Sequence, residues 1–202
     1  MQAIREKTQK IIEDWIQPRS KVLDLGCGDG TLLSRLTDRK HIEGTGVEIS
    51  QDMIVKCLGR GISVYQADID RGLSQWDDLS FDYVILTATL QVINKPYRVI
   101  NEMLRVGQFA VISLSNFGYV ANRISIMRNG CMSGNMRLAG NWHDTPVIRF
   151  ACLNEFMKSL DEMDIKILDA RYLFPMGIMR NTGAPLGNIF VKEALFMMGH
   201  QE

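Results

Sequence analysis

The chain has 202 residues, 46% of them hydrophobic and 23% charged, and this composition fits one globular α/β domain over residues 1–202. Basic and acidic residues number 23 each, so no net charge would attract the chain to a nucleic acid or an anionic membrane. No signal-peptide pattern opens the sequence, and no stretch approaches the roughly 20 apolar residues of a membrane span, so we expect a cytoplasmic protein with no nucleic-acid or membrane partner.

Helical and strand-like apolar patterns alternate along the chain, which is typical of a doubly wound sheet. The pattern predicts a first helix that ends before Pro18, and an apolar run at residues 81–87 of the kind found in strands buried on both faces. The predicted helices cover residues 4–16, a segment that follows Gly30, and residues 51–58, 97–106 and 153–163. The predicted strands cover residues 21–25, 44–49, 62–67, 81–87, 109–114, 165–174 and 189–197.

Two segments depart from this alternation. Residues 116–146 contain four glycines and form a predicted irregular segment of about 30 residues, longer than an ordinary loop. The last two strands have no room for a crossover helix between them, so we expect them to pair antiparallel. The fold predicted is a Rossmann-like sheet of seven strands, mostly parallel, with one antiparallel strand near the C-terminal edge.

The segment VLDLGCGDG, residues 22–30, ends the first strand and places a glycine at every second position of the following turn. Glycine permits a positive φ and a close approach of the backbone to a ligand. A P-loop needs G-x-x-x-x-G-K-[ST] and the dinucleotide fingerprint needs G-x-G-x-x-G, whereas this loop reads G-x-G-x-G after Asp24. ATP hydrolysis is therefore excluded and NAD binding is disfavoured.

The same segment resembles motif I of the class I S-adenosylmethionine-dependent methyltransferases, and the resemblance extends over the first five strands. S-adenosylmethionine has no pyrophosphate, so a loop that binds it need not surround phosphates. The loop only has to let the ligand's aminocarboxypropyl chain pass along the backbone. The resemblance implies that Asp24 accepts from the ammonium group or holds the loop, that Glu48 binds the ribose hydroxyls, and that Asp68 binds the adenine amine. The implied site for S-adenosylmethionine or S-adenosylhomocysteine comprises Asp24, Gly26, Cys27, Gly28, Gly30, Glu48, Ile49, Asp68 and Ile69.

Structural interpretations of these residues stay open. Asp24 could cap a helix or turn, and Glu48 and Asp68 could be solvated charges at strand ends. Cys27 is expected to be a small packing residue, because nothing near it in sequence would lower its pKa. The four cysteines are far apart with no C-x-x-C and no histidine at metal-ligand spacing, so we expect reduced thiols and no metal site.

A narrower resemblance, to the MetW proteins of bacterial methionine biosynthesis, covers most of the chain from Lys21 to Phe156. It rests on VLDLGCGDGTLLSRL, GTGVEIS, QADIDRGLSQWDDLSFDYVILTATLQVINKP, EMLRVGQFAVISLSNFG and WHDTPVIRF. The chain departs from that family at MRLAGNWHDTPV, in the loop before Trp142. The resemblance implies an activating association with homoserine O-acyltransferase, which acylates homoserine early in methionine synthesis.

Two functional classes therefore remain. The chain could be a regulatory subunit, with residues 116–146 as an interface whose first candidate anchor is Trp142, or a small-molecule methyltransferase with the same residues as a lid. Tyr119, His143 and Asp144 are the weak catalytic candidates for the second class. The Asp/Asn-Pro-Pro motif of nucleic-acid amino-methylases is absent after residues 81–87, which argues against that substrate class. A homo-oligomer is possible under either hypothesis.

Overall fold

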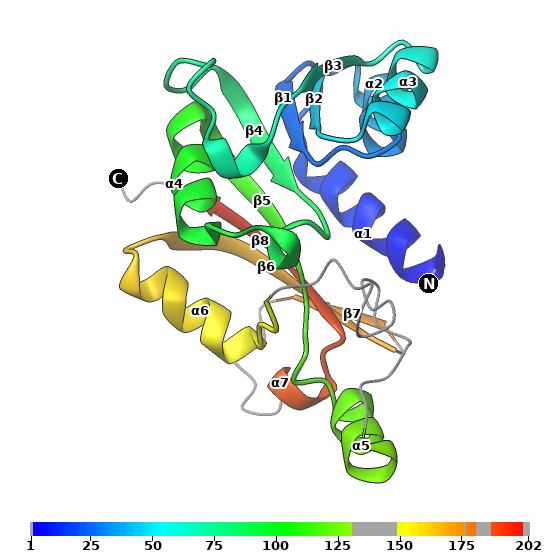
Figure 1. Cartoon of the computed structure of the whole chain (residues 1–202), viewed down its shortest axis with the longest axis vertical. Helices are drawn as coiled ribbons and strands as arrows, with labels where there is room; N and C mark the ends of the chain where they lie inside the picture. Colours follow the sequence, from blue (N-terminus) through cyan, green and yellow to red (C-terminus); the bar gives the residue numbers. More distant parts are fainter. Residues whose placement is uncertain (1, 131–148, 176, 181–186, 200–202) are drawn as a thin grey trace.

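A mixed eight-stranded sheet with the order β3-β2-β1-β4-β5-β8-β6-β7 organises the computed structural model, which describes residues 2–130, 149–175, 177–180 and 187–199 (Figure 1). The strands are β1 (Lys21–Leu25), β2 (Glu43–Glu48), β3 (Ser63–Gln66), β4 (Phe81–Leu86), β5 (Gly107–Ser115), β6 (Lys166–Phe174), β7 (Gly177–Arg180) and β8 (Glu193–Gly199). The helices are α1 (Gln2–Trp15), α2 (Thr31–Lys40), α3 (Gln51–Gly59), α4 (Pro96–Val106), α5 (Val120–Asn129), α6 (Leu153–Glu162) and α7 (Gly187–Phe190), with short 3-10 turns η1 (Ile69–Arg71) and η2 (Leu90–Val92).

Strands β1 to β5 are parallel, and the chain changes direction across the sheet between β1 and β4. Leu25 is paired with Val47 of β2 on one side and with Leu86 of β4 on the other. The carboxyl ends of these three strands therefore lie at the same edge of the sheet, at the switch point where open α/β sheets bind ligands.

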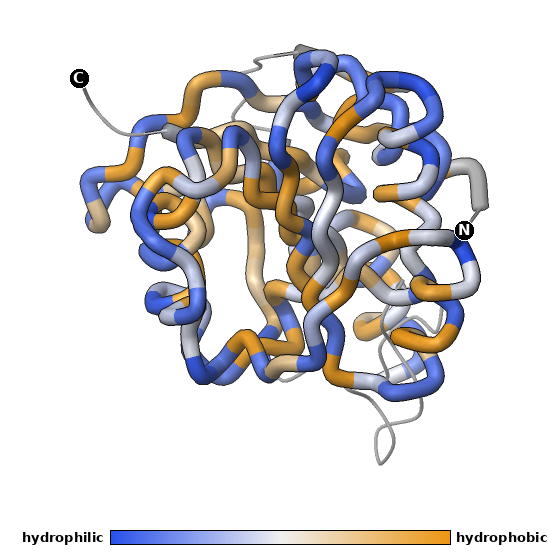
Figure 2. The backbone as a smooth tube through the Cα atoms, turned by 90° about the horizontal axis from the view of Figure 1, so that it is seen from above, coloured by the Kyte–Doolittle hydropathy of each residue, from blue (hydrophilic) through white to orange (hydrophobic). Residues whose placement is uncertain are grey.

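Alternate residues of the central strands pack into two hydrophobic layers. Leu23 and Leu25 belong to the layer that contains α4 and α6, whereas Val22 belongs to the layer that contains α1 and α2. Hydrophobic stretches of the chain cross the interior, and hydrophilic ones occupy much of the periphery, in the view from above (Figure 2). Because side chains alternate along a strand, Asp24 shares the face of Val22 and points to the side of the sheet that α1 covers.

Helix α1 is fixed to the far half of the sheet by buried polar contacts. The Trp15 indole Nε1 donates to Asp169 Oδ2 at 3.0 Å, and the Arg171 guanidinium lies 5.5 Å from the centre of the Trp15 ring. Nearer its N-terminus, the Thr8 hydroxyl donates to Glu193 Oε1 at 3.1 Å. These contacts hold α1 along β6 and β8, with its first half beside the loop that follows β1.

The predicted methyltransferase-like sheet is confirmed, with one strand more than expected. Strand β8 runs antiparallel to β5 and β6, as predicted for the C-terminal region. The additional strand, β7, pairs antiparallel with the end of β6 inside the segment expected to be only a connection. The strand predicted at residues 189–197 begins later, at Glu193, because the short helix α7 precedes it.

The segment at residues 116–146 is not wholly irregular, because residues 120–129 form α5. The only buried side chain of α5 belongs to Asn122, so the helix lacks the apolar stripe that marks a helix in sequence. Residues 131–148, which include Trp142, His143 and Asp144, lie outside the described residues.

Truncating Phe196 should strongly destabilise the fold. Its ring lies 5.3 Å from that of Phe156 on α6 and 6.2 Å from that of Tyr172 on β6, and the side chain is fully buried. Phe196→Ala should lower the free energy of unfolding by about 3–5 kcal/mol, measured by urea denaturation. Met127→Ala, at a residue that is 84% exposed, serves as the control; equal losses in both variants would contradict the assigned core.

Candidate functional site

The glycine loop after β1 is held by hydrogen bonds to the end of β2. The amides of Gly26 and Cys27 both donate to the carbonyl of Val47, at 2.8 and 3.1 Å. Gly26 has φ +69°, and a Cβ there would lie 2.7 Å from Thr89 Oγ1, so the turn requires glycine. Gly28 has φ +57°, but a Cβ there would meet no atom within 4 Å. Gly28 therefore borders open space, as a ligand-facing glycine would.

Glu48 ties the loop to β2 with both carboxylate oxygens. Oε2 accepts from the amide of Gly28 at 2.9 Å, and Oε1 accepts from the amides of Ile49 and Ser50, each at 2.9 Å. A carboxylate offers about four acceptor positions, so these bonds leave Oε2 with capacity for a further donor. Glu48 is thus more than a solvated charge at a strand end, because its carboxylate fixes the position of Gly28.

Asp24 is a buried acid with an unsatisfied oxygen. The residue is 1% exposed, and its Oδ1 has no hydrogen-bond partner in the described structure. Burial, together with the nearby charge of Glu48, raises the pKa of Asp24 from its ordinary 3.8 to about 8. An orphaned buried oxygen carries a free-energy penalty that a donor from a ligand would remove.

Two cavities meet at Gly26, which lines both. The first has a volume of about 390 Å³ and is bordered by the acids of β2 and of the loop after β3. It is lined by Gly26, Val47, Glu48, Ile49, Ala67, Asp68, Ile69, Asp70, Thr89, Val92, Ile93 and Asn94. The second has a volume of about 630 Å³ and lies between the glycine loop and α1. It is lined by Arg5, Thr8, Gln9, Ile12, Asp24, Gly26, Cys27, Gly28, Asp29, Leu32, Met53, Lys56, Thr87 and Ala88.

The smaller cavity has a rigid acidic wall. The Asp68 carboxylate accepts from the amide of Asp70 at 3.0 Å and so starts the turn η1. The Asp70 carboxylate in turn accepts from both the amide and the side-chain amide of Asn94, and from the amide of Lys95. This network joins the segment after β3 to the segment after β4, and Asp68 and Ile69 lie between them at the cavity.

Cys27 and Cys57 come together under the glycine loop, which the sequence did not predict. Their sulfur atoms are 3.7 Å apart, both residues are buried as free thiols, and the Cys57 thiol donates to the carbonyl of Gly28 at 3.1 Å. Burial raises the pKa of the Cys27 thiol, so it is protonated at neutral pH. This environment suits Cys27 as a packing residue, as expected from the sequence, better than as a nucleophile.

The predicted cofactor residues gather at these two cavities. Asp24, Gly26, Cys27 and Gly28 border the larger cavity; Gly26 also borders the smaller one, with Glu48, Ile49, Asp68 and Ile69. Gly30 packs against Cys57 behind the loop, where a Cβ would lie 3.0 Å from the sulfur. Of the catalytic candidates, Tyr119 precedes α5 and lines neither cavity, and His143 and Asp144 lie outside the described residues.

Sequence reasoning missed the contribution of α1 and of the segment after β4. Arg5, Thr8 and Gln9 are polar residues of an amphipathic helix, and nothing in their spacing marks a ligand site. Thr89 and Asn94 follow β4 in a stretch with no recognisable ligand motif. The position of that stretch at the end of a central strand was the only available signal.

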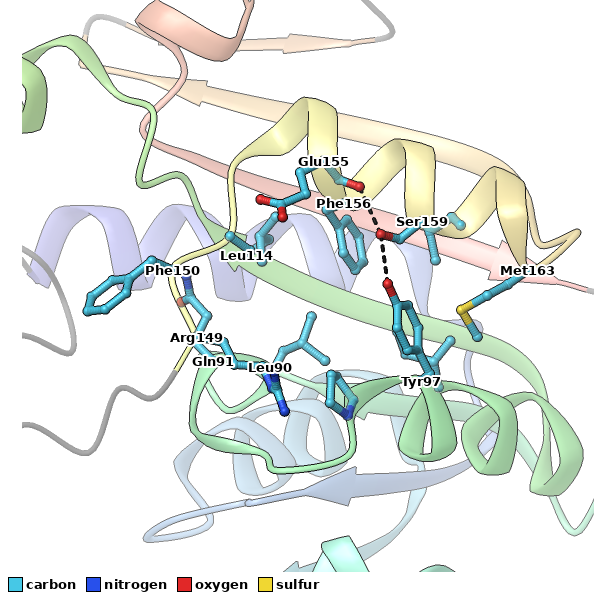
Figure 3. Close-up of a pocket in the computed structure, with 14 residues that line it drawn as sticks. Leu90, Gln91, Tyr97, Leu114, Arg149, Phe150, Glu155, Phe156, Ser159 and Met163 are labelled. Carbon is cyan, nitrogen blue, oxygen red and sulfur yellow. Dashed lines mark hydrogen bonds between the residues drawn. The ribbon is translucent and has the colours of Figure 1, made fainter.

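A separate cavity of about 340 Å³ lies between α4, the end of β5 and α6 (Figure 3). Figure 3 shows Tyr97 and Ser159 facing one another across it, joined by a hydrogen bond of 3.1 Å. Tyr97 and Phe150 line it although each is more than half exposed. Tyrosine is among the residue types that are enriched at the energetic centres of protein interfaces.

Two further properties of the described residues bear on function. In the described ranges, no three histidine, cysteine, aspartate or glutamate side chains gather as they would to hold a metal ion. Among the described helices, none is both long and apolar enough to cross a membrane.

The sheet order, the reversed strand β8 and the glycine loop at the switch point together define an α/β protein of the methyltransferase fold. The family model for "Methionine biosynthesis protein MetW" matches residues 5–198, and the chain belongs to this family. A curated relative, the bifunctional methionine biosynthesis protein MetXA/MetW of Rhodopirellula baltica, is 36% identical over 168 residues. The match covers 79% of this chain but only 27% of that relative.

Solved structures show the same fold at low sequence identity. A possible histamine N-methyltransferase of Thermotoga maritima superposes with a TM-score of 0.70 at 16% identity, over 96% of this chain and 87% of that one. The cyclase SpnF superposes with a TM-score of 0.67, also at 16% identity, over 96% of this chain and 80% of its own. Proteins with different names thus share this architecture, so the fold alone does not determine the reaction.

The variant Asp24→Asn should stabilise the ligand-free protein at pH 8. Asp24 has a raised pKa in the folded state, so its penalty is absent below pH ~4, grows as the pH rises and is complete above the folded value of about 8. The wild type should therefore lose stability between pH 5 and pH 8 relative to Asp24→Asn, as measured by thermal unfolding at both values. Parallel pH profiles for the two proteins would show that Asp24 is not a buried acid.

Proposed function

We propose that this chain binds S-adenosylmethionine or S-adenosylhomocysteine at the glycine loop and acts in methionine biosynthesis as an activating partner of homoserine O-acyltransferase. The observation that carries the binding proposal is the orphaned Oδ1 of Asp24 at a cavity bordered by Gly28. A buried acceptor without a donor, next to a glycine that faces open space, fits an ammonium-bearing ligand. The solved methyltransferases with this fold support the same ligand.

Each part of the ligand has a matching group in this site. Asp24 would accept from the ammonium, and the backbone at Gly28 would allow the aminocarboxypropyl chain to pass. The remaining acceptor capacity of Glu48 would serve the ribose hydroxyls, and Asp68 the exocyclic amine of adenine. Ile49 and Ile69 border the same cavity and would pack on the adenosine rings. When bound, S-adenosylmethionine would supply an electrophilic methyl group on its sulfonium.

The partner proposal rests on the family and on the composite relative. In that relative, the name indicates a MetW region and a MetXA region in one polypeptide, and one polypeptide keeps its two regions close together. Pathway logic agrees, because S-adenosylmethionine is made from methionine, and a protein that binds it could couple the end of a pathway to an early acylation. The separate cavity at Tyr97 and Phe150 offers a described surface for such contact, and Phe150 follows residues 116–146 closely in sequence.

Catalytic methyl transfer is the second candidate function. The cavity between α1 and the glycine loop measures about 630 Å³, more than an amino-acid arm requires, so it has room for a methyl acceptor. Methyl transfer from a sulfonium is an in-line displacement that needs alignment, and a base only when the acceptor carries a proton. Tyr119, His143 and Asp144 remain the candidates for such a base.

Gly28→Val should abolish binding of S-adenosylmethionine. The valine side chain would occupy the open space over the loop, and binding should fall below detection in isothermal titration calorimetry. Gly61→Val is the matched control, because Gly61 also has a positive φ with open space at its Cβ position but lies away from both cavities. Circular dichroism should show both variants folded, and unchanged affinity in Gly28→Val would move the ligand away from this loop.

Addition of this chain should stimulate a purified homoserine O-acyltransferase from the same source. Trp142→Ala, Arg137→Ala and Phe150→Ala should each reduce the stimulation, because aromatic and arginine anchors carry most of the binding energy at interfaces. Affinity for S-adenosylmethionine should stay unchanged in these variants. Phe190→Ala, at an exposed aromatic residue of α7, is the control.

The opposite result would favour the catalytic alternative. In that case the same variants would leave the acyltransferase unaffected and weaken ligand retention. Conversion of S-adenosylmethionine to S-adenosylhomocysteine, dependent on a defined acceptor and on His143, would then identify the chain as a methyltransferase.

A further inference from the structure

The larger cavity has an acid at one end and two cations at the other. Its buried wall carries the carboxylate of Asp24, which is 1% exposed, whereas its rim carries Arg5 of α1 and Lys56 of α3. The Arg5 side chain is 54% exposed. A buried acid in the interior and cations at the rim match a zwitterion whose ammonium points inward, where its charge would favour ionisation of Asp24, and whose carboxylate points outward. The reverse orientation would place two carboxylates together in a site of low polarity.

The backbone of the glycine loop does not supply the anion site. The amides of Gly26 and Cys27 donate to the Val47 carbonyl, that of Gly28 to Glu48 and that of Gly30 to the Cys27 carbonyl. The Thr31 amide at the start of α2 donates to Asp29 Oδ1. The remaining amide of this stretch belongs to Asp29, whose own carboxylate would repel an anion. A carboxylate bound here must therefore be recognised by side chains.

Arg5 lies at the cavity, and in the part of the chain that the structure describes its side chain is held there only by a long ion pair with Asp29. Its Nη2 lies 3.6 Å from Asp29 Oδ1, which is an ion-pair contact longer than a hydrogen bond. Asp29 is already satisfied without Arg5, because it accepts from the Thr31 hydroxyl at 2.7 Å and from Arg60 Nη2 at 3.0 Å. A modest rotation of Arg5 toward a ligand would leave Asp29 with these partners.

Lys56 has similar freedom on the opposite rim. The only hydrogen-bond contact of its ammonium group within the described residues is a weak one to the Met53 sulfur, at 4.0 Å. Arg5 and Lys56 come from different helices, α1 and α3, and both border the same cavity as Asp24. Two cations whose side-chain contacts among the described residues are long or weak thus converge on the rim opposite a buried acid.

We infer that Arg5, assisted by Lys56, binds the carboxylate of the ligand's amino-acid end, so that the site selects adenosine ligands that retain an intact α-amino acid. This inference rests on the proposed binding of S-adenosylmethionine or S-adenosylhomocysteine. It predicts discrimination against 5′-methylthioadenosine, which lacks the whole amino-acid arm, and against decarboxylated S-adenosylmethionine, which lacks only the carboxylate. Arg5 is a specificity-determining residue in this proposal.

The same contact would connect the ligand to α1. Thr8, one turn after Arg5, is bonded to the buried Glu193 at the start of β8. A carboxylate held by Arg5 would therefore join the glycine loop, through the ligand, to a helix anchored on the far half of the sheet. Ligands without the carboxylate would add no such link, and the long Arg5–Asp29 ion pair would remain the direct contact of Arg5 with the loop.

The test compares four ligands on three proteins by isothermal titration calorimetry. The ligands are S-adenosylmethionine, S-adenosylhomocysteine, decarboxylated S-adenosylmethionine and 5′-methylthioadenosine. The proteins are the wild type, Arg5→Ala and Lys10→Ala, which removes an exposed positive charge from the same helix outside the cavity. Arg5→Ala should lower the affinity for S-adenosylmethionine and S-adenosylhomocysteine about tenfold or more, as expected for a lost hydrogen bond between charged groups. Arg5→Ala should leave the affinity for decarboxylated S-adenosylmethionine and 5′-methylthioadenosine unchanged. Lys10→Ala should bind all four ligands as the wild type does.

The alternative outcomes are distinguishable. If Arg5→Ala weakens all four ligands equally, or none of them, the carboxylate contact is wrong while binding at the glycine loop stands. If the wild type binds neither S-adenosylmethionine nor S-adenosylhomocysteine, the proposed function fails together with this inference. Partial recovery of S-adenosylhomocysteine affinity in Arg5→Lys would support a charge contact rather than a packing effect.

Discussion

The geometry of the site depends on how the end of β2 holds the glycine loop. The Val47 carbonyl and the Glu48 carboxylate accept three consecutive amides of that loop, those of Gly26, Cys27 and Gly28. Because the amides are directed at β2, the loop bends away from the space above it, and Gly28 is left facing a cavity. The same bend encloses Asp24 beneath the loop. The open path, the buried acid and the position of Glu48 therefore follow from one set of hydrogen bonds.

The elements that could be predicted from the sequence are those whose burial requires apolar residues. Strands β1, β4 and β5 are buried on both faces and read as apolar runs, so the strands themselves and a candidate site at their carboxyl ends could be inferred. Helix α5 buries only Asn122, and β7 is a four-residue edge strand, so neither carries a periodic apolar signal. Their existence depends on tertiary pairing that no local pattern encodes.

Part of the candidate site could also be predicted from the sequence, and part could not. Glycines and acids at strand ends follow a spacing that physical reasoning can interpret, and they gather at the two cavities. Arg5 and Lys56 carry no such signal, because an exposed cation on an amphipathic helix is usually only a solvated residue. The contact between Cys27 and Cys57 was equally hidden, since thirty residues and a whole strand separate them in sequence.

The cost of Asp24 supports the proposal that this site binds a ligand, whether or not a methyl group is transferred. A buried carboxylate with an unsatisfied oxygen destabilises the ligand-free fold, and a neutral side chain at the same position would relieve that penalty. Such a residue has a role only if something else satisfies it, and a cationic ligand does so through charge and hydrogen bonding together. Binding and stability are therefore linked at Asp24. In a regulatory subunit, this linkage would make the ligand-bound and ligand-free states differ in stability. A partner enzyme would need such an energetic difference in order to distinguish the two states.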